Sequence, residues 1–323
     1  MTKTYGQVIR ETIDENMAKD KSIILIGEDI GFYGGGFGIT KGLYEKYGPE
    51  RVIDTPMSEQ GFTGLGIGAA MNGLKPIVEI MFMDFMTLAY DQLMNHASVF
   101  SYQTNGSIKV PLVIRTPAGG GRGYGATHSK TLIGPLMHIP GIKILCPSSA
   151  RNARGLLNAA IQDPDPVIFV EHKLLYSKKE ELEIPDLIPI GKAAIARKGK
   201  DALVITFGKS VDDSIAVADI LEKEGVSVEI IDLLTIKPLD MELIGSSVER
   251  IGKVLIVEEG YSVCGVASEI IARINETSFY SLKAPIRRVC TLDIPIPCAI
   301  KAEAQMLPSA ERIEKELRGL LNE

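Results

Sequence analysis

The sequence predicts an α/β protein with two domains, and three observations support this prediction. The chain has 323 residues, which exceeds the usual size of a single domain. Short apolar runs rich in Val and Ile alternate with helical patterns, and these runs lack the two-residue alternation of a half-exposed strand. Strands buried on both faces are typical of a parallel, doubly wound sheet. The alternation stops at a charged stretch that ends in prolines, and then it starts again.

The first domain is predicted over residues 1–180, and a linker over residues 181–189. The linker is inferred from its charged residues and from Pro185 and Pro189, which interrupt regular structure. Strands are expected at 23–26, 52–53, 76–82, 111–115, 142–146 and 166–171. Helices are expected at 4–19, 59–72, 84–102 and 150–162.

The second domain is predicted over residues 190–323 and repeats the same alternation. Val211, Ile215, Ala218 and Leu221 fall on one face of a helix, which is the spacing of an amphipathic segment. Strands are expected at 202–207, 226–232, 253–258 and 286–292. Helices are expected at 211–223, 239–251, 265–275 and 309–321.

Composition excludes several classes of protein. The formal net charge is −6 and no basic tract occurs, so nucleic acid is not an expected partner. No apolar run approaches the roughly 18 residues that span a bilayer, and no N-terminal signal is visible, so we expect a cytoplasmic protein without a membrane partner. Neither the four cysteines nor the histidines have metal-ligand spacing, so the cysteines are interpreted as reduced core residues.

The first candidate functional residue is Glu59. It follows a short strand and a turn limited by Pro56, and Ser58 is in the position to cap a helix of small residues. A carboxylate there can handle a proton for a buried ligand. The helix N-terminus would lower its pKa and burial would raise it.

Three glycine-rich segments have weaker signals. The segment 64–69 matches a loose dinucleotide fingerprint, but close helix packing explains it better. The segment 34–41 fails the phosphate-loop pattern and is interpreted as a hinge or covering loop, or as a surface turn. The segment 119–125 precedes His128 at the expected C-terminal edge of the sheet, where ligands bind in this architecture. His128 is therefore either a ligand-binding residue or an exposed loop histidine.

Ordered segments along essentially the whole chain resemble the beta subunit of the thiamine-diphosphate-dependent 2-oxoacid dehydrogenases. The matching segments include Gly27–Gly31, Asp54–Pro56, Ser58-Glu59, Asp84-Phe85, His128-Ser129 and Asp293–Pro297. The resemblance implies a thiamine-diphosphate-binding-type, parallel-sheet pyrimidine domain followed by a transketolase C-terminal-like α/β domain.

The resemblance also implies roles for four residues. Glu59 matches the acid that hydrogen-bonds the N1′ nitrogen of the cofactor's aminopyrimidine and promotes its proton exchange. Phe85 matches the aromatic residue that lies against this ring. His128 matches a histidine that orients the substrate or assists acyl transfer to a lipoyl group. Glu28 matches an acid in a polar path that links paired active sites.

The resemblance implies thiamine diphosphate and Mg²⁺ as cofactors, with potassium as a third ion. The family's Gly-Asp-Gly and Asn motif for diphosphate and Mg²⁺ is missing, so an alpha subunit is expected to hold them in an α2β2 assembly. Potassium is expected on the backbone carbonyls of Leu112, Ala160, Ile161, Asp163 and Asp165. Asp293 matches the surface that docks the lipoyl acyltransferase core.

The expected activity is oxidative decarboxylation of a 2-oxo acid, with pyruvate as the substrate and lipoamide as the acceptor. Residues 81–85 and 171–173 are more similar to the acetoin dehydrogenase branch, so acetoin cleavage is the alternative. Lys130 and Gln60 depart from the family pattern. A self-sufficient transketolase-like enzyme and a non-catalytic assembly subunit are the remaining alternatives.

Overall fold

The computed structural model describes residues 2–181 and 187–323. The chain forms two compact units, one made of Met1–Ala118 and His138–Ile190 and the other of Gly119–Met137 and Gly191–Glu323. Residues 119–137, which the sequence analysis assigned to the first domain, belong to the second unit. Residues 182–186 of the predicted linker lie outside the described residues, and the domain boundaries stay a prediction.

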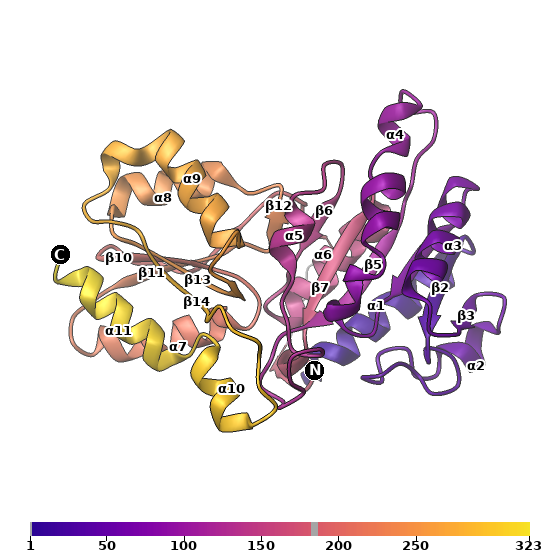
Figure 1. Ribbon diagram of the computed structural model, residues 1–323, viewed down its shortest axis with the longest axis horizontal. Coiled ribbons are helices and arrows are strands. Elements are labelled where there is room, and N and C mark those ends of the chain that lie inside the picture. The colour runs from indigo at the N-terminus through magenta and orange to yellow at the C-terminus, as the bar shows by residue number, and fades with distance from the viewer. Residues whose placement is uncertain (1, 182–186) are drawn as a thin grey trace. The chain divides into compact units, whose positions relative to one another are not determined.

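The first unit is built on a parallel sheet (Figure 1). Its strands lie in the order β6 (Lys143–Leu145), β7 (Val167–His172), β5 (Val113–Ala118), β4 (Lys75–Glu79), β2 (Ile23–Glu28) and β3 (Val52–Thr55). Every neighbouring pair in this series is parallel. The strands β5 and β7 are buried along their whole length, as apolar runs without alternation predict.

The principal helices of this unit are α1 (Tyr5–Lys19), α3 (Glu59–Met71) and α6 (Ala150–Gln162). The helices α1 and α6 contact each other, and Asn16 donates a hydrogen bond to Asn158 at 2.7 Å. A capping box starts α1, because Thr4 Oγ1 accepts from Gln7 N at 3.2 Å and Gln7 Oε1 accepts from Thr4 N at 2.8 Å. The smaller elements are β1 (Thr2–Thr4), α2 (Leu43–Tyr47), α5 (Ile133–Met137, in the second unit), the 3₁₀ helix η3 (Lys173–Leu175) and β8 (Lys179–Glu181).

The helix predicted at residues 84–102 was wrong. The chain instead forms a 3₁₀ helix η1 (Met83–Thr87), a π-helix η2 (Gln92–Ala97) and a short helix α4 (Phe100–Gln103). Thr87 donates its hydroxyl to Asp84 O at 3.0 Å, and Ser98 donates to Met94 O at 2.9 Å. Such side-chain bonds to carbonyl oxygens compete with regular helical bonding, which explains the breaks.

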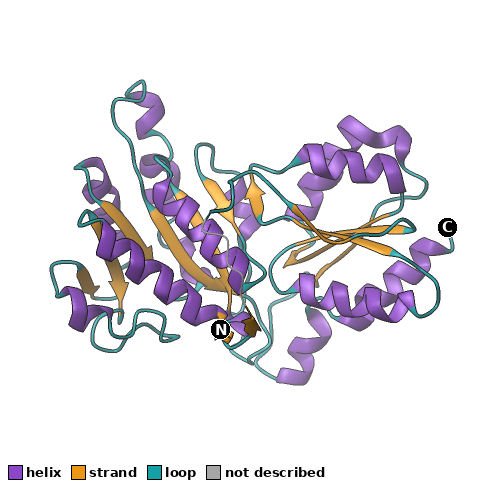
Figure 2. Ribbon diagram, turned by 180° about the vertical axis from the view of Figure 1, so that it is seen from behind, coloured by secondary structure: helices purple, strands orange, loops and turns teal. Residues whose placement is uncertain are grey.

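The second unit has a five-stranded sheet with helices on both faces (Figures 1 and 2). Its order is β14 (Arg287–Thr291), β13 (Val254–Tyr261), β10 (Ala202–Thr206), β11 (Val228–Asp232) and β9 (Ala194–Arg197). The helices α7 (Ser210–Glu222) and α11 (Ala310–Leu321) cover one face, and α8 (Met241–Ile251) and α9 (Val266–Ser278) cover the other. The remaining elements are β12 (Thr235–Lys237), the 3₁₀ helix η4 (Phe279–Ser281) and α10 (Ile300–Met306).

The edge strand β9 was not predicted from the sequence. It pairs antiparallel with β11, and its side chains are mostly exposed, so it lacks the apolar run of a buried strand. The core of this unit lies between the sheet and the pair α7 and α11, where Val217, Leu221 and Leu317 are fully buried. No helix in the described ranges is long and apolar enough to cross a membrane.

The cysteines also required a correction. Cys146 and Cys290 are buried, as expected for core thiols, whereas Cys264 and Cys298 are exposed. Burial raises the pKa of the Cys290 thiol to about 12, with the charge of Glu258 as a further cause. Cys264 and Cys298 lie in loops rich in Gly and Pro, which the spacing of cysteines alone does not reveal.

Candidate functional site

Four carboxylates gather near the carboxyl ends of β2 and β3. Glu28 ends β2 and Asp29 follows it, Asp54 lies in β3, and Glu59 begins α3. Burial raises the pKa of Glu28, and the charges of Asp29, Glu59 and Asp54 raise it further, in that order. The structure therefore brings the two predicted acids, Glu28 and Glu59, into one electrostatic site. Such a site favours a bound proton or a partner with positive character.

The backbone beside these acids is shaped for close approach. A Cβ atom added to Gly31 would lie only 2.7 Å from Asp54 Oδ2. Asp29 itself has a left-handed φ of 55°, and its carbonyl oxygen accepts a hydrogen bond from Gly35 N at 2.8 Å. Gly35 belongs to the predicted loop 34–41, which is thus tied directly to the residue after β2.

The loop 34–41 is bonded within itself. Gly38 N donates to Gly35 O and Thr40 N donates to Gly34 O, both at 3.0 Å. Thr40 also donates its buried hydroxyl to Ile30 O at 2.9 Å. These bonds favour a formed loop over a freely moving hinge. Within this loop, the ring of Phe37 meets those of Tyr176 and Phe82, with centroids 5.3 and 5.6 Å apart.

Glu59 is the first residue of α3, as predicted, and its side chain is half-buried. Ser58 occupies the N-cap position, but its side chain makes no capping hydrogen bond within the described residues. Gly66 packs against β4, since an added Cβ would lie 2.7 Å from Val78 Cγ2. This contact agrees with the packing interpretation at Gly66, whereas a Cβ atom added to Gly68 would have nothing within 4 Å.

Phe85 lies in η1, directly beyond β4. Its ring meets Phe82 edge-on with centroids 6.2 Å apart, and Phe82 in turn meets Phe37 at 5.6 Å. Strand β4 pairs with β2 in a register that sets Glu79 opposite Gly27. The chain therefore leaves the sheet toward Phe85 at the same edge where Glu28 ends its strand.

A buried ion network, which was not predicted from the sequence, lies at the ends of the neighbouring strands β4, β5 and β7. Arg115 donates to both oxygens of Glu171 at 2.7 and 2.8 Å and to Glu79 Oε2 at 2.7 Å. Tyr176 donates its hydroxyl to Glu171 Oε2 at 2.7 Å. Burial raises the pKa of Glu79, against the lowering effect of Arg115. The sequence contains a signal for this network, because Glu79, Arg115 and Glu171 each lie at or near the end of an apolar run that forms a strand.

The network reaches the loop above it. A Cβ atom added to Gly35 would lie 3.1 Å from Glu79 Oε1 and 3.1 Å from Thr40 Oγ1. Arg115 is 1% exposed and Glu171 is fully buried, so these charges can be retained only because they are paired. We conclude that the network supports the loop 34–41 from inside.

His128 lies in the second unit, and the other three predicted catalytic or cofactor-binding residues lie in the first. Its Nδ1 is 2.9 Å from Thr127 Oγ1, which restrains the ring. The glycine-rich segment before it is bonded to the second unit, because Gly120 N donates to Glu259 Oε1 at 2.5 Å and Gly123 N to Glu303 Oε2 at 2.7 Å.

Four of the five expected potassium ligands lie at or just after the end of α6, and Leu112 directly precedes β5. Lys143 donates to Asp163 Oδ1 at 2.5 Å and to Asp165 Oδ2 at 3.2 Å, so both aspartate side chains are already paired. Leu112 O accepts from Val167 N at 2.9 Å, and Ala160 O accepts from Asp163 N at 3.3 Å. Within the described part of the chain, no group of three or more His, Cys, Asp or Glu side chains is arranged to hold a metal ion.

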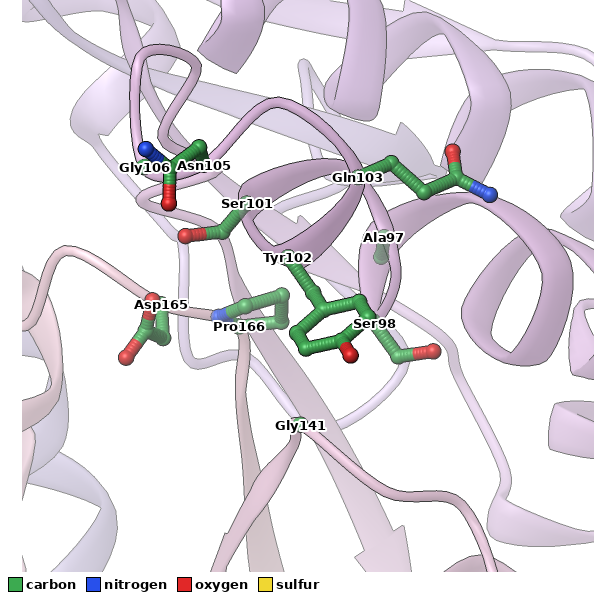
Figure 3. Close-up of a pocket in the computed structure, with 10 residues that line it drawn as sticks. All are labelled: Ala97, Ser98, Ser101, Tyr102, Gln103, Asn105, Gly106, Gly141, Asp165 and Pro166. Atoms are coloured by element: carbon green, nitrogen blue, oxygen red, sulfur yellow. The ribbon is translucent and has the colours of Figure 1, made fainter.

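An open cavity of about 730 Å³ lies beside α4 in the first unit (Figure 3). Its lining includes Tyr102, Asn105, Gly141 and Asp165, whereas Glu28, Glu59 and Phe85 are not among its lining residues in the described chain. The cluster of Glu28, Asp29, Asp54 and Glu59 is called the carboxylate site below. This site and the cavity are separate features of the first unit.

Comparison with known proteins identifies the family. Residues 1–179 match the transketolase pyrimidine-binding domain, and residues 191–313 match the transketolase C-terminal domain. The mitochondrial pyruvate dehydrogenase E1 component subunit beta-1 of Arabidopsis thaliana is 45% identical over 315 residues, which are 96% of this chain and 87% of that protein. The chain belongs to the beta-subunit family of thiamine-diphosphate-dependent 2-oxoacid dehydrogenases.

This beta subunit also resembles proteins of the acetoin branch and transketolases. The acetoin:2,6-dichlorophenolindophenol oxidoreductase subunit beta of Cupriavidus necator is 42% identical over 323 residues, with 96% of this chain and 95% of the relative covered. A solved structure described as a split gene transketolase, inactive beta4 tetramer, has a TM-score of 0.82, 19% identity and 98% coverage of both chains, and it shows the fold alone. These matches confirm the predicted fold class and the family resemblance.

The carboxylate site fits the aminopyrimidine of the family's cofactor. Glu28 and Glu59 favour a group that can share a proton, and the pKa of Glu28 is raised by the neighbouring charges. The hydroxyls of Thr55 and Thr63, from β3 and α3, are buried without a hydrogen-bond partner in the described residues. Unpartnered buried hydroxyls beside an acidic cluster are typical of a site that binds a polar ligand.

Proposed function

We propose that this chain is the beta subunit of a decarboxylating component that oxidises pyruvate and transfers the acyl group to lipoamide. The observation that supports this most directly is the proximity of Glu28, at the end of β2, to Glu59, at the start of α3, with the pKa of Glu28 raised. The identity to pyruvate dehydrogenase beta subunits over nearly the whole chain supports the choice of substrate.

Within this proposal, Glu59 holds and exchanges a proton at the N1′ nitrogen of the aminopyrimidine. Thiamine diphosphate, when bound, supplies the electron sink that cleavage of the bond next to the carbonyl requires. Burial and the nearby charges of Asp29, Glu59 and Asp54 raise the pKa of Glu28, so Glu28 retains a proton more readily than an isolated acid. Phe85 packs against the ring and excludes water.

His128 is proposed to orient the substrate or to assist acyl transfer to the lipoyl group. An imidazole has one nitrogen that can donate a proton and one that can accept it, which suits proton transfer. The Thr127 hydroxyl lies 2.9 Å from Nδ1, and this contact favours the ring orientation that the structure shows. A restrained histidine is better suited to a positioned transfer step than a mobile one.

An alpha subunit is proposed to complete the site in an α2β2 assembly and to hold the diphosphate and Mg²⁺. The support is the missing diphosphate motif, the beta-subunit names of the relatives, and the large apolar side chains exposed on the first unit. Phe32 is 88% exposed, Met57 is 79% exposed and Leu65, on α3, is 51% exposed. Apolar exposure of this extent is typical of a partner surface.

A lipoyl acyltransferase core is proposed to dock near Asp293. This residue is exposed in a loop where Leu292 is 44% and Ile294 is 54% exposed. An exposed carboxylate flanked by apolar side chains suits a partner with a basic residue beside an apolar contact.

Potassium is proposed on the backbone carbonyls of Leu112, Ala160, Ile161, Asp163 and Asp165. The pairing of both aspartate side chains with Lys143 leaves carbonyl oxygens as the donors, and oxygen donors suit a hard cation. The test is the melting temperature of the assembled protein in potassium chloride and in choline chloride at equal ionic strength. A higher value in potassium is expected, and equal values would contradict the site.

Acetoin cleavage is the second candidate, and the 42% identical acetoin oxidoreductase beta subunit favours it. Both candidates use the same cofactor and acyl transfer, so the carboxylate site does not discriminate between them. The choice depends on the acyl pocket, which the alpha subunit is proposed to share.

The deciding experiment is to co-express this chain with its alpha-type subunit and measure dichlorophenolindophenol reduction with thiamine diphosphate and Mg²⁺. The panel contains pyruvate, branched-chain 2-oxo acids, 2-oxoglutarate and acetoin. Activity with pyruvate alone is expected, and activity with acetoin alone would establish the second candidate. An active homodimer of this chain would indicate a self-sufficient transketolase-like enzyme. Binding of the alpha subunit without any cofactor binding would indicate an assembly subunit.

A further inference from the structure

The glycine-rich segment before His128 requires external support to adopt one conformation. Gly119, Gly121, Gly123 and Gly125 have φ values of 93°, 89°, 69° and 76°, all in the left-handed region. Glycine at alternate positions gives the segment a large conformational freedom, so ordering it costs more entropy than ordering an average loop. The contacts that hold it therefore decide where His128 lies.

Two carboxylates of the second unit supply that support. Gly120 N donates to Glu259 Oε1 at 2.5 Å, and Gly123 N donates to Glu303 Oε2 at 2.7 Å. The segment also packs tightly on α10 and the residues after it, because a Cβ added to Gly120 would lie 2.7 Å from Leu307 Cδ1 and 3.0 Å from Glu303 Oε1. Glu303, in α10, thus contacts the segment at two of its glycines.

Glu303 is an unusual residue for a purely structural contact. It is 0% exposed, and its Oε1 has no hydrogen-bond partner among the described residues. A buried carboxylate with one unpartnered oxygen costs folding free energy, so the stability of the fold does not account for it. A residue that costs stability yet orders a flexible segment is typical of a functional region.

The segment is short enough to transmit this support to His128. Gly123 and His128 are five positions apart, and His128 N donates to Gly125 O at 3.3 Å. Ser129, directly after His128, is buried, so the segment is anchored on both sides of the histidine. Loss of the Gly123 anchor leaves His128 free to shift with the glycines before it.

We propose that Glu303 is a positioning residue that fixes the segment 119–128, and with it His128, through the hydrogen bond to Gly123. The catalytic consequence rests on the proposed function, in which His128 acts on the substrate or on acyl transfer. Glu303 itself touches neither, and it acts only through the backbone of the segment.

The test compares three variants in the protein assembled with its alpha subunit. Glu303→Leu and Glu303→Asp both remove the bond to Gly123, the first by deleting the acceptor and the second by shortening the side chain. Glu303→Gln keeps an acceptor oxygen of the same reach. The matched control is Glu311→Leu, which removes an exposed carboxylate from α11.

Turnover is the first readout. Glu303→Leu and Glu303→Asp are expected to lower kcat by roughly tenfold to a hundredfold, the scale of a displaced catalytic group, while KM changes less than about threefold. Glu303→Gln and Glu311→Leu are expected to stay within about threefold of the wild type. Adding Glu303→Leu to His128→Ala is expected to cause no further loss, because the two act in series.

Amide hydrogen exchange is the second readout and needs no activity. Glu303→Leu is expected to speed exchange at Gly123 and His128 by about tenfold or more, while the urea midpoint of unfolding does not fall. Unchanged exchange at these amides would overturn the proposal, and so would a kcat loss that adds fully to that of His128→Ala. A wild-type assembly that is inactive with the whole substrate panel would contradict the proposed function instead, and exchange would still decide the anchoring.

Discussion

At the scale of single residues, the distinctive feature is how the charge of one acid changes another. Burial and three neighbouring carboxylates raise the pKa of Glu28, and Glu59 is one of the three. From the sequence, only the helix N-terminus and burial were expected to act on the acid at the start of this helix. The structure adds the charges of neighbouring carboxylates, which raise the pKa of Glu28 further.

Glu59→Gln is expected to abolish cofactor activation and leave the fold intact. The amide cannot exchange a proton with the aminopyrimidine, yet it has nearly the same volume as the carboxyl group and the side chain is only half-buried. The measurement is exchange of the thiazolium C2 proton in the assembled protein, with the circular dichroism spectrum as the control. Exchange at the wild-type rate would refute the role of Glu59.

Glu28 is expected to make folding stability depend on pH in a definite direction. Its pKa is raised in the folded chain, so the folded state binds the proton more tightly than the unfolded state. The penalty for ionising it is absent well below the ordinary value of 4.5 and grows as pH rises through the raised pKa.

Glu28→Gln removes this penalty. The free energy of unfolding of the variant minus that of the wild type is therefore expected to be larger at pH 7 than at pH 4. The effect is small because the side chain is partly exposed to solvent. Urea unfolding at both pH values measures it, and a smaller difference at pH 7 than at pH 4 would mean that the pKa of Glu28 is lowered by folding.

At the scale of secondary-structure elements, α3 shows how one helix serves two purposes. Its N-terminus presents Glu59, and its small residues let it approach the sheet closely at Gly66. A Cβ atom added to Gly68, two residues further, has nothing within 4 Å. Substitution of these two glycines by a larger residue is therefore expected to have opposite effects on stability, although both belong to the same run of small residues.

Gly66→Ala and Gly68→Ala form a matched pair on this helix. The first is expected to destabilise the free chain by about 1–3 kcal/mol, because the new methyl group collides with Val78 in β4. The second is expected to stabilise it by about 0.5–1 kcal/mol, because alanine favours the helix and meets open space. Urea unfolding gives both values. Equal effects of the two substitutions would mean that α3 does not pack on β4 at Gly66.

At the scale of the whole molecule, the exposed apolar side chains of the first unit are best explained by the proposed alpha subunit. Leu65 projects from the middle of α3 and is 51% exposed. We expect the alpha subunit to cover this side chain in the assembly. Association of that kind stabilises the beta chain by mass action, by about 2.7 kcal/mol at a hundredfold excess over Kd.

Leu65→Glu is expected to weaken assembly with the alpha subunit at least about tenfold and to change the stability of the free chain by less than about 0.5 kcal/mol. The charged side chain remains solvated in the free chain and loses its water only in the assembly. Ile220→Glu on α7, 43% exposed in the second unit, is the control. Analytical size exclusion measures the assembly, and equal behaviour of the two variants would place the interface elsewhere.

The sequence alone determined the parallel α/β architecture, the family and the position of Glu59 at the start of a helix. These three features depend on local patterns, namely unbroken apolar runs, helix caps and ordered motifs. Such patterns involve residues that are close to each other in the sequence. The main sheet strands and long helices were therefore predicted within a few residues, apart from the segment 84–102, where side chains compete for the backbone.

Only the tertiary structure decided which residues act together. The ion network of Glu79, Arg115 and Glu171 joins three strands, and the anchors of Gly120 and Gly123 come from residues more than a hundred positions away. Such pairings depend on strand order and on the path of the chain through space, which local periodicity does not encode. For the same reason, the glycine-rich loop in the sequence was enough to single out His128. Glu303 could be related to this loop only from the tertiary structure.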